Sequence, residues 1–286
     1  LGSFQGIIEN APDIASVNVS PEGFATKIYD SDENEIQTLS SAGANRTYVT
    51  IDQIPKDLQH AFIAIEDERF YEHNGIDMRG ILRAASITLS SGEMSQGAST
   101  ITQQLLKNNV FNAFNESTIE KIKRKVQEQY LAIKLETVMS KDSILENYLN
   151  TINLGNGYYG VQAAARGYFN KDVSELSISE CAVIASITKS PTGLNPIRHA
   201  DRNKDRQSQV LLNMKEQEYI SQEEYDEAVS DDVYARLEGI ELIHILLMNL
   251  SISLLLTLCH RRDIQKHRLQ ALYIVADFRF IQLRTQ

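Results

Sequence analysis

Residues 66–75 read EDERFYEHNG, and residues 97–108 read GASTITQQLLKN. Ordinary core helices do not place so many polar side chains of different chemistry in so short a stretch. The first string comes at the end of a helical pattern that begins just after Pro55. We therefore expect Glu66 near the end of an amphipathic helix and Gly75 in a left-handed backbone conformation beyond it.

Helix signals dominate the rest of the chain. The Ser-x-x-Glu spacing, which satisfies two free backbone donors at a helix start, begins at Ser117, Ser177 and Ser221. After residue 55 there is no convincing alternation of apolar and polar residues, and no nucleotide-binding glycine motif. The pattern predicts a mainly α fold with a small extended or β segment at the N-terminus, where two short runs suggest a hairpin. The expected helices span 118–138, 141–151, 159–169, 177–189, 202–217 and 221–229, and the expected strands span 25–29 and 35–39.

Composition narrows the class of protein. The chain has 286 residues, of which 42% are apolar, so it can bury a sizeable core. Its net charge of −10 argues against a nucleic-acid partner, which would require a basic surface. The two cysteines, Cys181 and Cys259, form neither a CxxC motif nor a metal-ligand spacing. Cys181 lies in an apolar helical run and is expected to be a small buried residue.

The helix expected at 118–138 carries two sets of side chains. One side carries the apolar residues Ile122, Val126, Tyr130 and Ile133. Another face carries the charged residues Lys121, Arg124, Lys125 and Glu128. From spacing alone this charged face is either a surface ion pair of Arg124 with Glu128, or a cationic patch for a pyrophosphate in which Glu128 orients the cations or a bound divalent ion.

Taken together, these strings resemble the motifs of one known family. EDERFYEHNG, GASTITQQLLKN, RKVQE at 124–128 and ILENYLN at 144–150 follow the order of the motifs of the peptidoglycan glycosyltransferase domain of class A penicillin-binding proteins, glycosyltransferase family 51. The resemblance runs from about Pro55 to Met214, and no motif is broken. It implies a lysozyme-like, mainly helical fold. Glu146, in the fourth motif, is expected to hold the fold rather than to react.

The resemblance also implies an activity and a site. The enzyme would polymerise lipid II, the undecaprenyl-pyrophosphate-linked disaccharide-pentapeptide, into β-1,4 glycan strands with inversion at the anomeric carbon. Such a transfer needs a base, positive charge for the departing pyrophosphate, and a groove that aligns the sugars. The expected catalytic residues are Glu66, as the base, and Glu128. The expected substrate-binding residues are Asp67, Phe70, His73, Ser99, Thr100, Gln103, Gln104, Lys107, Asn108, Arg124 and Lys125.

Cofactor, partners and location follow from the same resemblance. No cofactor is required, although a divalent cation such as Mg at the pyrophosphate is an alternative, and no dedicated metal site is expected. The expected partners are lipid II, the growing glycan strand and the membrane surface, with a transpeptidase domain downstream in the intact protein. The expected location is the extracytoplasmic face of a bacterial plasma membrane, with an anchor helix upstream of Leu1. Residues 90–97 are small and polar, and we expect them to form a mobile flap beside the groove.

The predicted domains are a linker or hairpin segment at 1–50, the glycosyltransferase domain at 51–238, and an aberrant tail at 239–286. Residues 242–258 read literally as a marginal membrane span. Our hypothesis is instead a frameshift near residues 237–243, because the alternative frame can encode strings that resemble the family's linker. The DNA sequence tests this hypothesis.

Two other functions remain open from the sequence. A lysozyme-like glycan hydrolase or lytic transglycosylase also uses carboxylates in a helical groove, but it needs no cationic cluster for a pyrophosphate. Lys107 and the pair Arg124 and Lys125 therefore favour the polymerase. An inactive fragment that binds glycan or lipid II is the other alternative.

Overall fold

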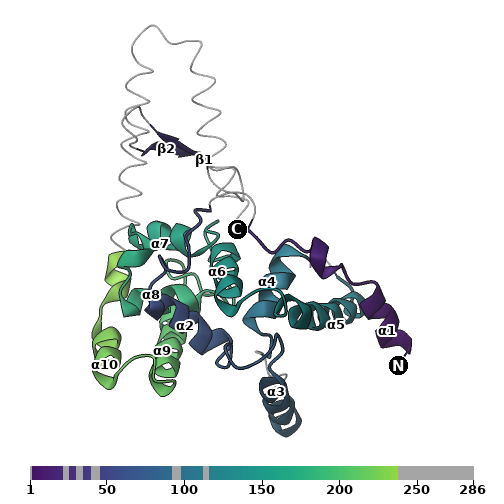
Figure 1. Ribbon diagram of the computed structural model, residues 1–286. Coiled ribbons are helices and arrows are strands. Elements are labelled where there is room, and N and C mark those ends of the chain that lie inside the picture. Colours follow the sequence, from purple (N-terminus) through teal and green to yellow (C-terminus); the bar gives the residue numbers. More distant parts are fainter. Residues whose placement is uncertain are drawn as a thin grey trace. The chain divides into compact units, whose positions relative to one another are not determined.

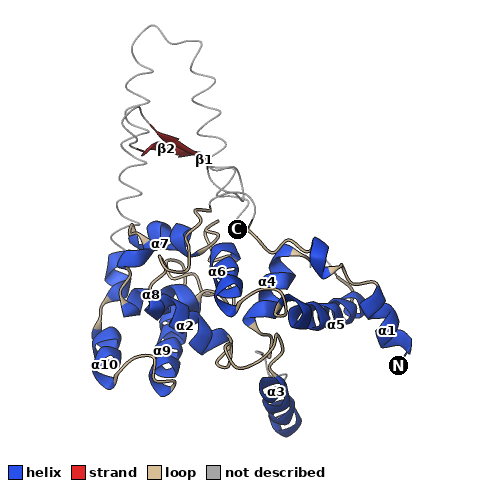
Figure 2. Cartoon of the chain, in the orientation of Figure 1, coloured by secondary structure: helices blue, strands red, loops and turns tan. Residues whose placement is uncertain are grey.

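The structure is a computed structural model, and it describes residues 2–21, 26–29, 35–39, 46–91, 98–111 and 116–237. Within these ranges helices predominate, which confirms the expected mainly α class (Figures 1 and 2). None of the described helices is both long enough and apolar enough to cross a membrane. The lysozyme-like arrangement and the domain boundaries stay predictions.

The helices follow one another along the chain with short connections. Their bounds are α1 (Gly2–Glu9), α2 (Lys56–Glu66), α3 (Met78–Ser91), α4 (Ile101–Asn109), α5 (Thr118–Leu135), α6 (Lys141–Thr151), α7 (Val161–Phe169), α8 (Ile178–Ser186), α9 (Ala200–Glu216) and α10 (Gln222–Ser230). Single 3₁₀ turns lie at Ile14–Ser16 and Val173–Glu175.

The expected hairpin segment is confirmed as a two-stranded antiparallel sheet. Strand β1 (Thr26–Tyr29) pairs with β2 (Glu35–Leu39), with Thr26 opposite Leu39. The register shifts by an irregularity between Ile28 and Tyr29.

Helix α8 lies at the centre of the core. Every residue from 179 to 186 is buried, including Cys181, as the sequence predicted. Helix α8 contacts α2, α7, α9 and α10, and α2 also packs against α9 (Figure 1). An apolar helix surrounded on several sides is what its nearly continuous apolar sequence requires. This packing fixes the C-terminal end of α2, where Glu66 lies.

A second set of contacts joins α4 to α5 and α6. The N-cap of α4 is Thr100, whose hydroxyl accepts a hydrogen bond from the Gln103 amide, while the Gln103 side chain accepts one from the Thr100 amide. The capping boxes predicted at Ser117, Ser177 and Ser221 are all confirmed.

The buried face of α5 differs from the apolar side read from the sequence. Ile122 and Ile133 are 57% and 45% exposed. The residues that α5 buries are Glu128, Leu131, Ala132 and Leu135. Helix α5 therefore has two apolar sides, and the one nearer its C-terminal end faces the core.

Three sequence expectations concern parts of the chain outside the described residues. Most of the predicted flap is among them, because residues 92–97 are not described. The same holds for the marginal membrane span at 242–258 and for the tail interpreted as frameshifted.

Candidate functional site

Glu66 is the last residue of α2, as the sequence predicted. Its carboxylate is 14% exposed and is held from both sides by residues of other elements. Oε2 accepts a hydrogen bond from Nε2 of Gln104 at 2.9 Å, and Oε1 accepts one from the hydroxyl of Thr188 at 2.6 Å. The guanidinium of Arg206 on α9 lies 3.9 Å from Oε1. The carboxylate is therefore fixed in position while part of it stays accessible.

The amide of Gln104 is oriented by a buried tyrosine. The hydroxyl of Tyr148 on α6 donates to Oε1 of Gln104 at 3.1 Å, which turns the NH₂ group of Gln104 towards Glu66. Burial, together with the charges of Glu66 and Asp67, raises the pKa of Tyr148 well above its usual value. The phenol therefore keeps its proton and remains a donor.

Asp67 and His73 bind to each other rather than to the carboxylate of Glu66. The Asp67 carboxylate is 6% exposed, and Nε2 of His73 lies 2.9 and 3.0 Å from its two oxygens. Oδ2 of Asp67 also accepts the amide proton of Ile101 at 2.9 Å. The ammonium of Lys141 lies 3.5 Å from Nδ1 of His73, and Nε2 of the same ring faces Asp67. Substrate contact by either residue stays a prediction.

Three other predicted binding residues, Phe70, Thr100 and Gln103, take part in core packing or helix capping. Phe70 is fully buried, and its ring lies under the ammonium of Lys141, 4.5 Å from the ring centroid. Substrate binding by Phe70 stays a prediction, and the structure places its ring in the core. The carbonyl oxygen of the Gln103 side chain is occupied in the α4 capping box, and the Thr100 hydroxyl donates to the Gly75 carbonyl at 2.8 Å. Both residues shape the start of α4.

The second predicted catalytic carboxylate, Glu128, is fully buried. Oε1 is bonded to Arg124, and Oε2 accepts from Lys125 at 2.8 Å. Arg124 also donates to both oxygens of Glu116, at 2.8 and 2.9 Å. Both oxygens of Glu128 are thus engaged by cations of its own helix, and its part in the reaction stays a prediction. Its bonds hold Arg124 and Lys125 in place, which fits the interpretation of this face as a cationic patch that Glu128 orients.

Lys125 connects this ion cluster to the GASTITQQLLKN string. Its ammonium donates to the hydroxyl of Ser99 at 2.8 Å, and its side chain is 44% exposed. Lys107 is exposed and lies on the same side of α4 as the cavity described next. Asn108 is also exposed, but it is not among the described residues that line that cavity.

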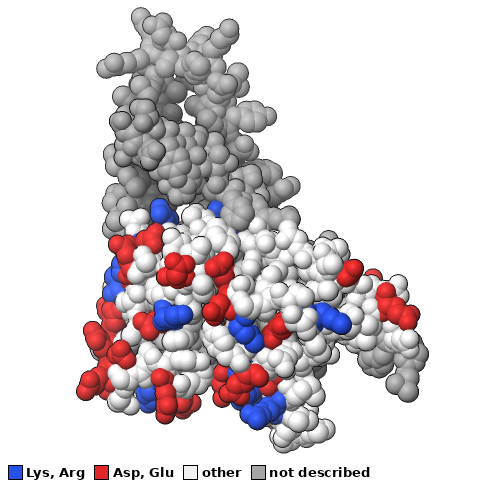
Figure 3. All heavy atoms as spheres, viewed as in Figure 1, with Lys and Arg blue, Asp and Glu red and all other residues white. Residues whose placement is uncertain are grey.

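A cavity of about 690 Å³, which we call the basic groove, brings together six of the predicted residues: Glu66, Ser99, Gln103, Gln104, Lys107 and Lys125. Glu66 is the single acidic residue among the described residues that line it, against five basic ones: Arg83, Lys107, Lys125, Lys189 and Arg206. The chain as a whole carries a net charge of −10, and acidic side chains gather over α10 in Figure 3. A positively charged groove in a protein of net negative charge is suited to an anionic ligand.

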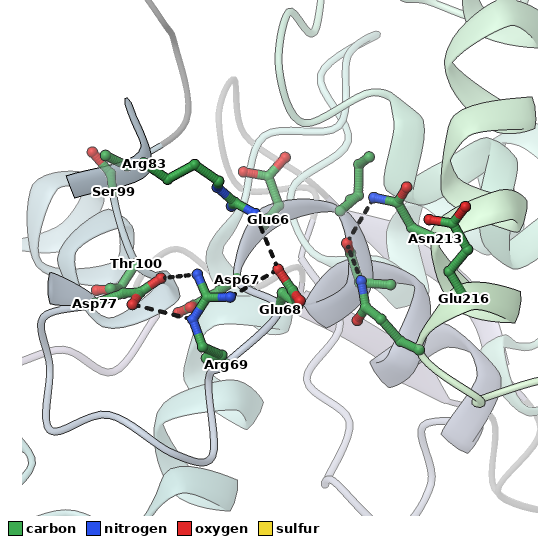
Figure 4. A pocket seen from close by; sticks show the side chains of 14 residues that line it. Glu66, Asp67, Glu68, Arg69, Asp77, Arg83, Ser99, Thr100, Asn213 and Glu216 are labelled. Carbon is green, nitrogen blue, oxygen red and sulfur yellow. Dashed lines mark hydrogen bonds and ion pairs between the residues drawn. The ribbon is translucent and has the colours of Figure 1, made fainter. Parts of the chain in front are cut away.

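On its other side, Glu66 borders a smaller cavity of about 440 Å³, the acidic cavity. Figure 4 shows Glu66 there, with Arg83 on one side and Asn213 on the other. Arg69 binds Asp77 at 2.6 Å and Glu68 at 3.0 Å within this cavity. Glu66 thus lies where two cavities of different charge meet.

Sequence reasoning missed Thr188 and Arg206, both of which face Glu66. No motif marked Thr188. Arg206 comes three residues after Asn203 and four before Val210, both of which are buried. Helical spacing could therefore have placed Arg206 on the inner side of α9. Burial lowers the pKa of Arg206, an effect that the charge of Glu66 opposes.

The comparisons with known proteins agree with the motifs. The family model described as Transglycosylase matches residues 32–215. Penicillin-binding protein 1A of Escherichia coli strain K12 is 42% identical over 241 residues, which are 84% of this chain and 28% of that protein. Penicillin-binding protein 1F of Bacillus subtilis strain 168 is 45% identical over 200 residues, 70% of this chain and 27% of that protein. The chain thus spans about a quarter of the length of these relatives.

Among solved structures, the crystal structure of penicillin-binding protein 1A from Haemophilus influenzae matches 75% of this chain and 21% of its own. The identity is 26% and the TM-score is 0.40. This low score adds nothing to the family assignment, which rests on the sequence matches.

Proposed function

The chain belongs to the transglycosylase family found in penicillin-binding proteins, and we propose that its helical domain is a peptidoglycan glycosyltransferase that polymerises lipid II. The observation that carries this proposal is the position of Glu66. It is the single acidic group among the described residues lining a groove with five basic ones, which is where a base next to an anionic leaving group belongs.

In the proposed reaction, Glu66 takes the proton from the 4-hydroxyl of the incoming lipid II. The oxygen then forms a bond to the anomeric carbon of the growing strand. The bond from that carbon to the pyrophosphate oxygen breaks, and the electron pair leaves with the undecaprenyl pyrophosphate. Attack from the side opposite the leaving group inverts the configuration and gives a β-1,4 link. The hydrogen bonds from Gln104 and Thr188 aim the Glu66 carboxylate during this step.

The basic groove supplies the charge for the leaving group. Nε of Arg206 is buried and has no hydrogen-bond partner among the described residues, so it is available to a phosphate oxygen. Lys107 and Lys125 add two ammonium groups to the same groove. Charged donors that are already in place stabilise charge developing in the transition state.

We propose that Glu128 takes part indirectly, by fixing Arg124 and Lys125. Both of its oxygens are engaged by these cations, so it offers no free carboxylate to a divalent ion. In this proposal polymerisation needs no resident cofactor, and a divalent cation such as Mg would be held by the oxygens of the pyrophosphate.

The proposed location is the outer face of a bacterial plasma membrane, because the undecaprenyl chain of lipid II stays in the bilayer. Helix α3 supports this, because it exposes four large apolar residues, Met78, Leu82, Ile87 and Leu89, at 60%, 66%, 45% and 88%. Exposed apolar groups of this size on one helix suit contact with lipid. An anchor helix upstream and a transpeptidase domain downstream belong to the same proposal.

The test is the identity of the product. The full chain is incubated with labelled lipid II in detergent, and the products are separated before and after lysozyme digestion. We expect long glycan that lysozyme cuts. Release of sugars from finished peptidoglycan without polymer would indicate the hydrolase instead. Retention of lipid II by folded protein with no product would indicate a binding fragment.

A further inference from the structure

Thr188 has one hydroxyl proton and two acceptors within reach of it. Oγ1 lies 2.6 Å from Oε1 of Glu66 and 2.9 Å from the carbonyl oxygen of Ala185. A threonine hydroxyl donates one hydrogen bond and can accept others. Both neighbours therefore cannot receive the proton at once, and the arrangement depends on whether Glu66 carries a proton itself.

Two arrangements of the hydrogens are compatible with the positions of Oε1 of Glu66, Oγ1 of Thr188 and the carbonyl oxygen of Ala185. With Glu66 ionised, Thr188 donates to Oε1. With Glu66 protonated on Oε1, Glu66 donates to Oγ1 and Thr188 donates to the carbonyl of Ala185. That carbonyl, in the last turn of α8, also accepts the backbone amide of Thr188 at 3.5 Å, and a carbonyl oxygen has two lone pairs, so it can accept the hydroxyl as well. Only hydrogens differ between the two arrangements, so no heavy atom has to move.

The other oxygen of Glu66 has no such freedom. Oε2 faces the NH₂ group of Gln104, whose orientation is fixed by the hydroxyl of Tyr148. An amide NH₂ group can only donate. A proton placed on Oε2 towards Gln104 would meet the hydrogen that Gln104 donates, whereas the hydroxyl of Thr188 beside Oε1 can accept one. Of these two neighbours, Thr188 is therefore the one that can accept the proton of Glu66.

From this geometry we propose that Thr188 is a positioning residue that lets Glu66 hold and release a proton at Oε1 without rearrangement of the site. The inference rests on the proposed function of Glu66 as the base. The proton leaves the 4-hydroxyl of the acceptor sugar, stays on Oε1 of Glu66 while the hydroxyl of Thr188 turns to Ala185, and then passes to water. The hydroxyl of Thr188 turns back when Glu66 is ionised again.

Other charged or titratable groups also lie around Glu66, and a substitution at Thr188 leaves their side chains in place. Arg206 on α9 is the nearest cation, at 3.9 Å. The phenol of Tyr148 on α6 lies behind Gln104. The remaining charged residues lining the two cavities around Glu66 are Asp67, Glu68, Arg69, Asp77, Arg83, Lys107, Lys125, Lys189 and Glu216.

The test compares Thr188→Val, which keeps the shape but lacks the hydroxyl, with Thr188→Ser, which keeps the hydroxyl. Thr192→Val is the matched control, because Thr192 is an exposed threonine of the same loop. The first readout is the titration of the Glu66 side-chain carboxyl carbon, followed by ¹³C NMR on the full chain. It needs no substrate. The second readout is the pH dependence of lipid II polymerisation.

In Thr188→Val the ionised carboxylate loses a charge-assisted hydrogen bond, whereas the neutral acid loses a weaker one. We expect the midpoint of the Glu66 titration to move up by about one pH unit. Polymerisation should fall about tenfold on the acid limb of the pH profile. Thr188→Ser should restore both values, and Thr192→Val should change neither.

An unchanged Glu66 titration in folded Thr188→Val would overturn the proposal. So would a loss of activity that Thr188→Ser fails to restore. If the native chain makes no polymer, the proposed function fails, but the NMR titration still decides whether Thr188 interacts with the proton of Glu66.

Discussion

The carboxylate of Asp67 accepts the backbone amide proton of Ile101 at 2.9 Å, which ties the end of α2 to the start of α4. A negative charge at this position also suits the positive end of the α4 dipole. Asp67 directly follows Glu66, and α4 carries Gln104, which donates to Glu66. The two polar strings are therefore held together directly. The bond from Ile101 to Asp67 sets the distance between Glu66 and its hydrogen-bond donor, Gln104.

The first prediction concerns Gly75, which closes the first string. Its φ of +83° disfavours any residue with a Cβ, and a Cβ here would lie 2.5 Å from the carbonyl carbon and oxygen of Ala132. We expect Gly75→Ala to lower the free energy of unfolding by about 3 kcal/mol, from backbone strain and overlap together. Chemical denaturation measures this loss.

Gly157→Ala is the matched control. Gly157 has a similar φ of +76°, but nothing lies within 4 Å of the position of its Cβ. Strain alone should cost about 1 kcal/mol there. Equal losses in the two variants would contradict the close contact between Gly75 and α5.

The second prediction concerns the buried charge of Glu128. Glu128→Gln removes one partner of two cations and leaves Arg124 and Lys125 competing for a neutral amide. We expect the free energy of unfolding to fall by about 3 kcal/mol, because the carboxylate is fully buried. Lys125 can turn to solvent, which limits the loss. Urea denaturation measures it.

Glu116→Gln serves as the comparison for Glu128. Among the described residues Glu116 pairs with Arg124, and its side chain is 12% exposed, so its neutralisation leaves the pairs of Glu128 in place. We expect a smaller destabilisation, about 1 kcal/mol. A Glu128→Gln variant as stable as Glu116→Gln would show that Glu128 does not organise this cluster.

The third prediction is a pH dependence at Asp77. Burial alone would raise the pKa of the Asp77 carboxyl, but hydrogen bonds from Arg69 and from the Gly80 amide hold it below its usual value. A carboxyl with a lowered folded pKa contributes stability above its unfolded pKa of about 3.9. That contribution disappears as the pH falls through the folded value.

Asp77→Asn should therefore lose less stability than the native chain when the pH is lowered from 7 to 3. Urea denaturation at both pH values measures the difference. Glu223→Gln, an exposed position on α10, should behave like the native chain. Identical pH dependence in Asp77→Asn and the native chain would rule out a stabilising Arg69–Asp77 pair.

Several helix starts could be predicted from short sequence patterns. The capping boxes at Ser117, Ser177 and Ser221 lie within one helical turn, so the sequence alone could place the starts of three helices. The same rule also identifies the cap of α4 in the second string. Thr100 has Gln103 three residues later, as a capping box requires, whereas Ser99 has Thr102.

The site was predictable only in part, because its assembly depends on contacts between distant residues. The position of Glu66 at a helix end was local and is confirmed. Its partner Thr188 is 122 residues away, and nothing in a single sequence pairs them. Phe70 and Glu128 lie inside the right strings, yet their side chains point into the core, which only the packing of the helices decides.

The most direct test of the account compares Glu66→Gln with Glu72→Gln, two neutral substitutions within one ten-residue string. Glu72 is 65% exposed and pairs only loosely with Arg79, at 3.6 Å. Turnover of labelled lipid II and its binding are measured for both variants and for the native chain. We predict that Glu66→Gln lowers turnover at least about 100-fold while lipid II still binds, and that Glu72→Gln matches the native chain. Turnover by Glu66→Gln within about threefold of native, a difference under about 1 kcal/mol, would contradict the assignment of Glu66 as the base.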